Sequence, residues 1–115
     1  MPESRKNVLV IEPDPEVRDI FCNLLRRQNY RVRTGADFAE ALRSVKENRF
    51  ECLIIDADTD GVRGTDALGR LRLVDPMLKV LLVSRRLEEA PLQAPDDRTF
   101  FCYVDPANLA DAPAP

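Results

Sequence analysis

Three short, uninterrupted runs of apolar residues constrain the fold of this chain more than any other feature of its sequence. They occupy residues 8–11, 52–55 and 80–83. A run of this length without polar alternation predicts a strand that is buried on both faces. Segments with helical periodicity lie between the runs, so the sequence predicts alternating strands and helices around a parallel sheet.

The predicted helices begin at recognisable capping residues. Asp14 can accept hydrogen bonds from free backbone N–H groups, and Pro15 suits the first position of a helix. Asp37 and Glu40 have the spacing of a capping box for a second helix. Thr65 is the expected cap of a third helix.

Two further strands are expected at residues 30–34 and 100–104, the first of them at a half-exposed edge. Pro91 and Pro95 exclude a regular helix across residues 87–94, because proline lacks the N–H that a helix interior needs. At most one helical turn fits residues 107–110. We therefore expect degenerate fourth and fifth helices, one domain over residues 1–106, and a short Pro/Ala-rich tail over residues 107–115.

Composition narrows the class of protein. A net charge of −3 offers no concentrated basic surface, so we expect no direct nucleic-acid partner. No apolar run approaches the length of a membrane span, and the first residues lack the apolar stretch of a secretory signal, so we expect no membrane partner and a cytoplasmic location. Three widely spaced cysteines and no histidine favour reduced core thiols over a zinc site.

Polar residues end or follow the predicted strands, where ligands bind in sheets of this kind. They are Glu12, Asp56, Ser84 and Asp105. Asp14, a predicted helix cap, adds another carboxylate nearby. Carboxylates that meet at strand ends either bind a divalent cation or include a nucleophile. The neighbouring pair at residues 85–86, two arginines, is interpreted as solvated.

The ordered series of these segments resembles the receiver domain of two-component response regulators. The resemblance runs through VLVIEPDPEVR (8–18), FECLIIDADTDGVRG (50–64), VLLVS (80–84) and YVDP (103–106). It implies a flavodoxin-like three-layer sandwich with a five-stranded parallel sheet in the order 2-1-3-4-5. It also implies that Asp56 stands at the phosphoacceptor position and that Ser84 stands at the hydroxyl position.

In that family an acid pair and the phosphoacceptor hold Mg²⁺, and the aspartate takes the phosphoryl group from a histidine kinase or phosphotransfer protein. The metal ligands implied here are Glu12, Asp14 and Asp56. The sequence departs from the family at Pro13, which replaces one acid of the pair, and at Asp105, which replaces the lysine. Thr59-Asp60 replaces the usual Met-Pro. The switch aromatic position falls on Cys102, or on Tyr103 after a shift of one residue.

The acidic side chains are expected to converge without a cation. Their negative charges would repel a phosphoryl group. We therefore interpret the chain as a pseudo-receiver that acts mainly through protein–protein contacts and binds Mg²⁺ weakly or not at all. Its partners would be a histidine kinase, a phosphotransfer protein, an output protein or a second copy of itself.

One alternative is a competent receiver that accepts phosphate on Asp56. A small enzyme on the same fold is a weaker alternative, because the chain has no histidine, no glycine-rich phosphate loop and no nucleophile elbow. We therefore expect no enzymatic activity.

Overall fold

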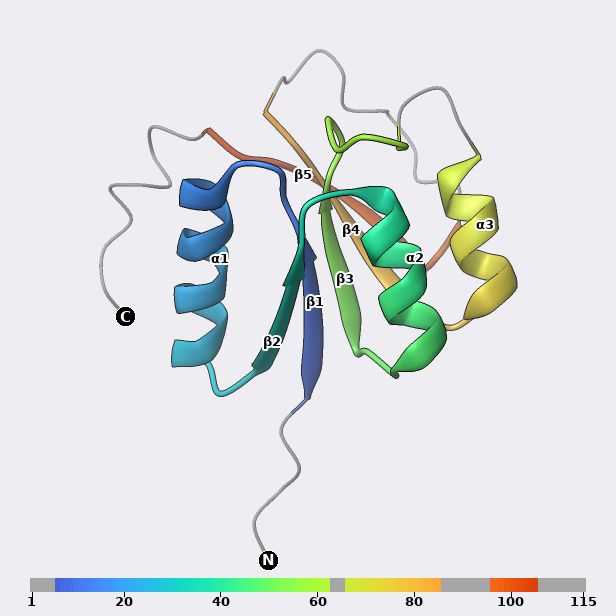
Figure 1. Ribbon diagram of the computed structural model, residues 1–115, viewed down its shortest axis with the longest axis horizontal. Helices are drawn as coiled ribbons and strands as arrows, with labels where there is room; N and C mark the ends of the chain where they lie inside the picture. Colours follow the sequence, from blue (N-terminus) through green and yellow to red (C-terminus); the bar gives the residue numbers. More distant parts are fainter. Residues whose placement is uncertain (1–5, 63–65, 86–95, 106–115) are drawn as a thin grey trace, which may run out of the picture.

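A computed structural model describes residues 6–62, 66–85 and 96–105, which form a parallel sheet with helices on both faces (Figure 1). Strands and helices alternate through most of the chain, as the sequence predicts. In chain order the elements are β1 (Asn7–Ile11), α1 (Pro15–Arg27), β2 (Arg31–Gly35), α2 (Phe38–Glu47), β3 (Cys52–Asp56), α3 (Ala67–Val74), β4 (Lys79–Ser84) and β5 (Thr99–Tyr103).

The sheet has five strands in the order β2-β1-β3-β4-β5, and every neighbouring pair is parallel. The expected strand order is thereby confirmed. Because all strands run in the same direction, their carboxyl ends lie along one edge of the sheet. The residues that follow β1, β3 and β4, the three central strands, are thus brought to adjacent positions.

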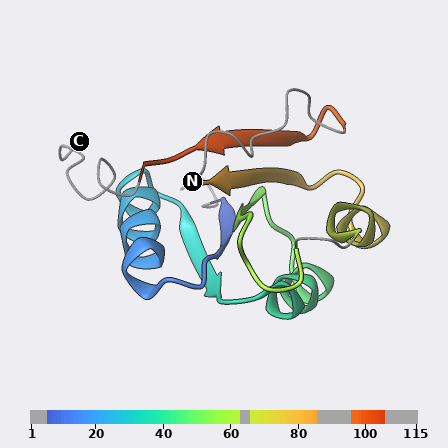
Figure 2. The same cartoon turned by 90° about the horizontal axis from the view of Figure 1, so that it is seen from above.

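The sheet separates two apolar cores, and Figure 2 shows α1 on one face with α2 and α3 on the other. Leu9 and Leu53 point toward α2 and α3 and have no exposed surface. Val10 and Ile54 point the other way and pack with Phe21 of α1. Side chains alternate between the faces of a strand. Covering both faces therefore requires the unbroken apolar runs seen in the sequence.

Capping aspartates define where the helices begin. Asp14 accepts a hydrogen bond from the N–H of Glu16, and Asp37 accepts one from the N–H of Glu40, as predicted. The prediction for the third helix was wrong, because its cap is Asp66 and not Thr65. The helix starts at Ala67, so the residue directly before it supplies the carboxylate that reaches the Gly69 N–H at 3.2 Å.

The expectations for residues 87–94, for the turn at 107–110 and for the tail at 107–115 lie outside the described residues. The last strand begins one residue earlier than expected and forms the second edge of the sheet. In the described part of the chain, the helices are too short or too polar to cross a membrane.

Candidate functional site

The carboxyl ends of three central strands bring polar side chains into an otherwise apolar layer. Glu12 directly follows β1, Asp56 ends β3 and Ser84 ends β4. All three residues are buried, with exposed fractions of 2 %, 4 % and 8 %. Buried carboxylates are stable only when they are paired or hydrogen-bonded, so each must have partners nearby.

Both oxygen atoms of the Asp56 carboxylate are engaged. Oδ1 accepts a hydrogen bond from the backbone N–H of Asp58 at 2.7 Å. Oδ2 lies 3.3 Å from Nε of Arg85, with which it forms an ion pair. The carboxylate is therefore held on one side by the loop that follows β3 and on the other by the residue that follows β4.

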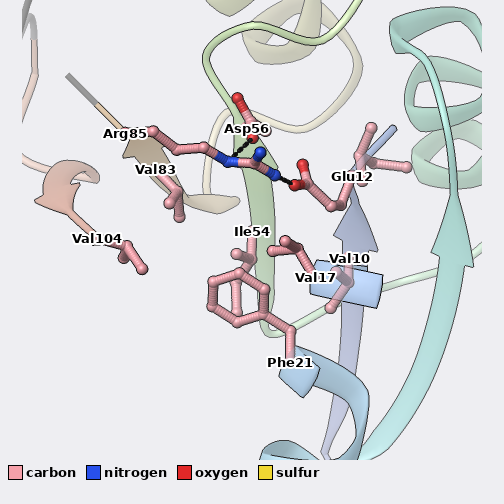
Figure 3. A pocket seen from close by; sticks show the side chains of 10 residues that line it. Val10, Glu12, Val17, Phe21, Ile54, Asp56, Val83, Arg85 and Val104 are labelled. Atoms are coloured by element: carbon pink, nitrogen blue, oxygen red, sulfur yellow. Dashed lines mark hydrogen bonds and ion pairs between the residues drawn. The ribbon is translucent and has the colours of Figure 1, made fainter. Parts of the chain in front are cut away.

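Arg85 lies between the carboxylates and joins them (Figure 3). Its Nη2 pairs with Oε1 of Glu12, and its Nη1 lies 3.8 Å from Oδ2 of Asp14. A guanidinium group is planar and donates from several edges, so one side chain can face several carboxylates at once. Arg85 thus links the ends of β1 and β3 and the start of α1.

Two sequence-based expectations are corrected by this arrangement. The side chain of Arg85 was expected to be solvated, and the acidic site was expected to contain no cation. Instead Arg85 is only 27 % exposed and pairs with Glu12 and Asp56. The physical reason is that two buried carboxylates need a compensating charge. The sequence contained a signal for this position, because Arg85 directly follows Ser84 at the end of a strand and so lies at the same edge of the sheet as the acids.

An apolar floor lies beneath the ion pairs. A cavity of about 10 Å³ is lined there by Arg85, by both buried acids and by apolar side chains from α1 and the sheet, among them Val17, Phe21 and Ile54. A space of this size holds at most about one water molecule. Such surroundings screen charges poorly, so they strengthen the attraction between Arg85 and the carboxylates.

The remaining predicted site residues occupy less buried positions. Asp14 is half-exposed and caps α1, so its first role is structural. Asp105 is half-buried and lies two residues beyond β5, on the same edge of the sheet. In the β4–β5 pairing, Tyr103 lies opposite Ser84 and Cys102 lies opposite Val83. Of the two candidates for the aromatic position, Tyr103 is therefore the neighbour of the strand-end hydroxyl.

The described residues fit a divalent cation only poorly. Within residues 6–62, 66–85 and 96–105, no three acidic, cysteine or histidine side chains are grouped so that they could hold a metal ion. The guanidinium group of Arg85 fills the space between Glu12 and Asp56, and Pro13 provides no side-chain ligand. One oxygen, Oε2 of Glu12, is buried without a hydrogen-bond partner in the described structure.

Comparison with known proteins places this geometry in context. The family model described as "Response regulator receiver domain" matches residues 8–95. The transcriptional regulatory protein PrrA of Mycobacterium tuberculosis is 34 % identical over 79 residues, which cover 69 % of this chain. Those residues correspond to 34 % of PrrA, so the chain spans about a third of the length of this curated relative.

Solved structures share the fold. The response regulator TrrA of Thermotoga maritima, in complex with Mg²⁺-BeF, superposes with a TM-score of 0.75 at 20 % identity, covering 92 % of this chain and 91 % of TrrA. A response regulator of Burkholderia pseudomallei, solved with a phosphorylated aspartic acid, calcium ion and citrate, gives a TM-score of 0.73 at 25 % identity. That superposition covers 92 % of this chain and 63 % of the other.

Proposed function

This chain belongs to the response regulator receiver family, and we propose that it is a receiver module that signals mainly by protein–protein contact. The observation that carries the proposal is the engagement of both Asp56 oxygens, one by the Asp58 N–H and one by Arg85. An attacking carboxylate needs an accessible oxygen and a neutralised phosphoryl group in line with it. In this chain Asp56 must first give up an ion pair.

The replacement of the family lysine by Asp105 also disfavours phosphorylation of Asp56. Asp105 stands at the position of the family lysine, so a negative charge replaces a positive one at this edge of the sheet. At 4 Å, a pair of like unit charges at an effective dielectric constant of 20 repels by about 4 kcal/mol. Arg85 offsets part of this repulsion but is already paired with Glu12 and Asp56. We therefore infer that Asp56 is a poor phosphoacceptor and that Mg²⁺ binds weakly.

One observation favours the alternative of a competent receiver that accepts phosphate from a histidine kinase. Arg85 supplies a permanent positive charge beside Asp56, and Ser84 keeps its hydroxyl at the end of β4. If the guanidinium group turned from Asp56 to an incoming phosphoryl group, it would supply the charge that Asp105 lacks. The two functions therefore differ in whether Arg85 remains bound to the carboxylates.

Intact mass spectrometry after incubation with acetyl phosphate and Mg²⁺ tests the proposal. The wild-type chain should show little or no phosphate adduct. The double variant Pro13→Asp with Asp105→Lys should form some adduct, and adding Asp56→Asn should abolish it. Rapid, stoichiometric labelling of the wild type that disappears in Asp56→Asn would overturn the proposal in favour of the alternative.

The proposed partners are proteins. A histidine kinase, a phosphotransfer protein or an output protein fits a receiver module, and a second copy of the chain is a further candidate partner. Two relatives, one named as a transcriptional regulatory protein and one as a DNA-binding response regulator, are about three times as long as the matched segment, so we assign DNA binding to none of the residues here. We likewise propose no enzymatic activity and a cytoplasmic location.

A further inference from the structure

We propose that Arg85 is an internal counter-ion that takes the place of a divalent cation in the acidic pocket. The inference deepens the proposed function and rests on it. The nitrogen atoms of Arg85 face Glu12, Asp14 and Asp56, which are the carboxylates that the family resemblance assigns to metal binding. Arg85 thus brings these three carboxylates together, as a bound metal ion does in the family.

Burial explains why a counter-ion is required. The side chains of Glu12 and Asp56 are exposed by only 3 % and 5 %, and they approach each other across the guanidinium group. Without a positive charge between them, the pair would be two buried, mutually repelling anions. A metal ion or an arginine can supply that charge, and this chain contains the arginine.

A tethered cation has an advantage over a dissolved one. Arg85 is held beside the pocket by β4, so its effective concentration there is high and does not depend on the ion content of the cell. The guanidinium group also keeps its charge at every physiological pH. A metal ion must displace Arg85 before it reaches Glu12 Oε1 or Asp56 Oδ2. The pocket should therefore be filled and metal-independent in the wild type.

The inference makes Mg²⁺ affinity depend on Arg85. In isothermal titration calorimetry, the Arg85→Gln variant should bind Mg²⁺ tighter than the wild type by on the order of tenfold or more, because a unit charge that competes for the same carboxylates is removed. Its melting temperature should be lower than that of the wild type in EDTA and should rise when Mg²⁺ is added. The melting temperature of the wild type should be the same in EDTA and in Mg²⁺.

Arg43→Gln is the matched control, because it removes the same charge from an exposed position on α2. It should leave both the Mg²⁺ affinity and the response to EDTA unchanged. Equal Mg²⁺ affinity of the wild type and Arg85→Gln would overturn the inference. Stabilisation of the wild type by Mg²⁺ to the same extent as the variant would also overturn it.

A second variant covers the case in which Arg85→Gln does not fold. Adding Glu12→Gln removes one buried anion together with the cation, so folding should be recovered if charge compensation is the role of Arg85. Failure of this double variant to fold would show that Arg85 is needed for packing and would overturn the inference. Phosphate labelling of the wild type bears on the proposed function alone, so the two can fail separately.

Discussion

Arg72 of α3 donates two hydrogen bonds, of 3.2 and 3.3 Å, to the carboxylate of Asp96, which lies 24 residues later in the sequence. The same guanidinium group donates to Oγ1 of Thr99, at 3.0 Å, and to the carbonyl oxygen of Leu78. Thr99 is almost fully buried at the start of β5. Arg72 therefore fastens α3 to the beginnings of β4 and β5, at the end of the sheet opposite Arg85.

The Arg72→Met variant should lower the free energy of unfolding by about 2 kcal/mol. The substitution keeps much of the apolar side chain but leaves the Leu78 carbonyl and the Thr99 hydroxyl without their charged donor. Urea denaturation followed by circular dichroism measures the change. Arg43→Met, at an exposed position, is the control and should stay within about 0.5 kcal/mol of the wild type. Equal losses in the two variants would contradict the prediction.

Asp96 should make the stability of the domain sensitive to acid. Hydrogen bonds from Arg72 and from the backbone N–H of Arg98 lower the pKa of Asp96 from 3.8 to about 2. A lowered pKa stabilises the folded state at pH values above the unfolded pKa. This contribution is therefore complete above about pH 4 and is lost as the pH falls toward 2.

Urea midpoints measured between pH 6 and pH 2 check this prediction. The stability of the wild type should fall more steeply below about pH 4 than that of Asp96→Asn, in which no carboxylate titrates at this position. Asp97→Asn, at the exposed neighbouring residue, controls for the change in net charge. Parallel curves for the wild type and Asp96→Asn would refute the link between Asp96 and acid stability.

The caps of α2 and α3 should differ in importance. Asp37→Ala should lower the free energy of unfolding by about 1 kcal/mol, because Asp37 bonds the N–H of Glu40 at 2.8 Å in a part-buried site. Asp66→Ala should cost less, because its bond to Gly69 is longer and exposed. Asp37→Ser keeps an acceptor and should retain most of the stability. A larger loss in Asp66→Ala than in Asp37→Ala would contradict this order.

The edge strand β5 should take part in self-association. Phe100 and Tyr103 are 51 % and 46 % exposed, and exposed apolar side chains on an edge strand favour contact with a partner. Phe101 does not belong to this surface, because it points to the opposite face from Phe100 and packs against the core beside Leu82. The predicted surface therefore consists of Phe100 and the strand edge, while Tyr103 is exposed on the opposite face of the strand.

Analytical ultracentrifugation over a range of concentrations measures the association. Phe100→Ser should weaken it by about tenfold, the effect of a single important contact residue. Leu73→Ser removes an exposed apolar side chain from α3, 87 % exposed, and should have no effect. A wild type that stays monomeric at high concentration would rule out self-association through β5.

Local and periodic features of the sequence were enough to predict alternating strands and helices around a parallel sheet. Unbroken apolar runs predicted strands covered on both faces, and the sheet order followed from the family resemblance. Asp14 and Asp37 were identified as caps, since a cap acts within three residues of its own position. Glu12, Asp56 and Ser84 were placed at one edge of the sheet, because parallel strands bring their carboxyl ends together.

The tertiary structure decided which way the Arg85 side chain points, and with it the charge balance of the site. Arg85 is 73 residues from Glu12 in the sequence, and no local spacing rule relates two such positions. Its side-chain direction depends on the apolar floor formed by α1 and the sheet, and on the need of two buried carboxylates for a positive charge. The sequence predicted that Arg85 belongs to a solvated basic pair. In the structure it pairs with the buried carboxylates of Glu12 and Asp56 and supplies the positive charge of the acidic pocket.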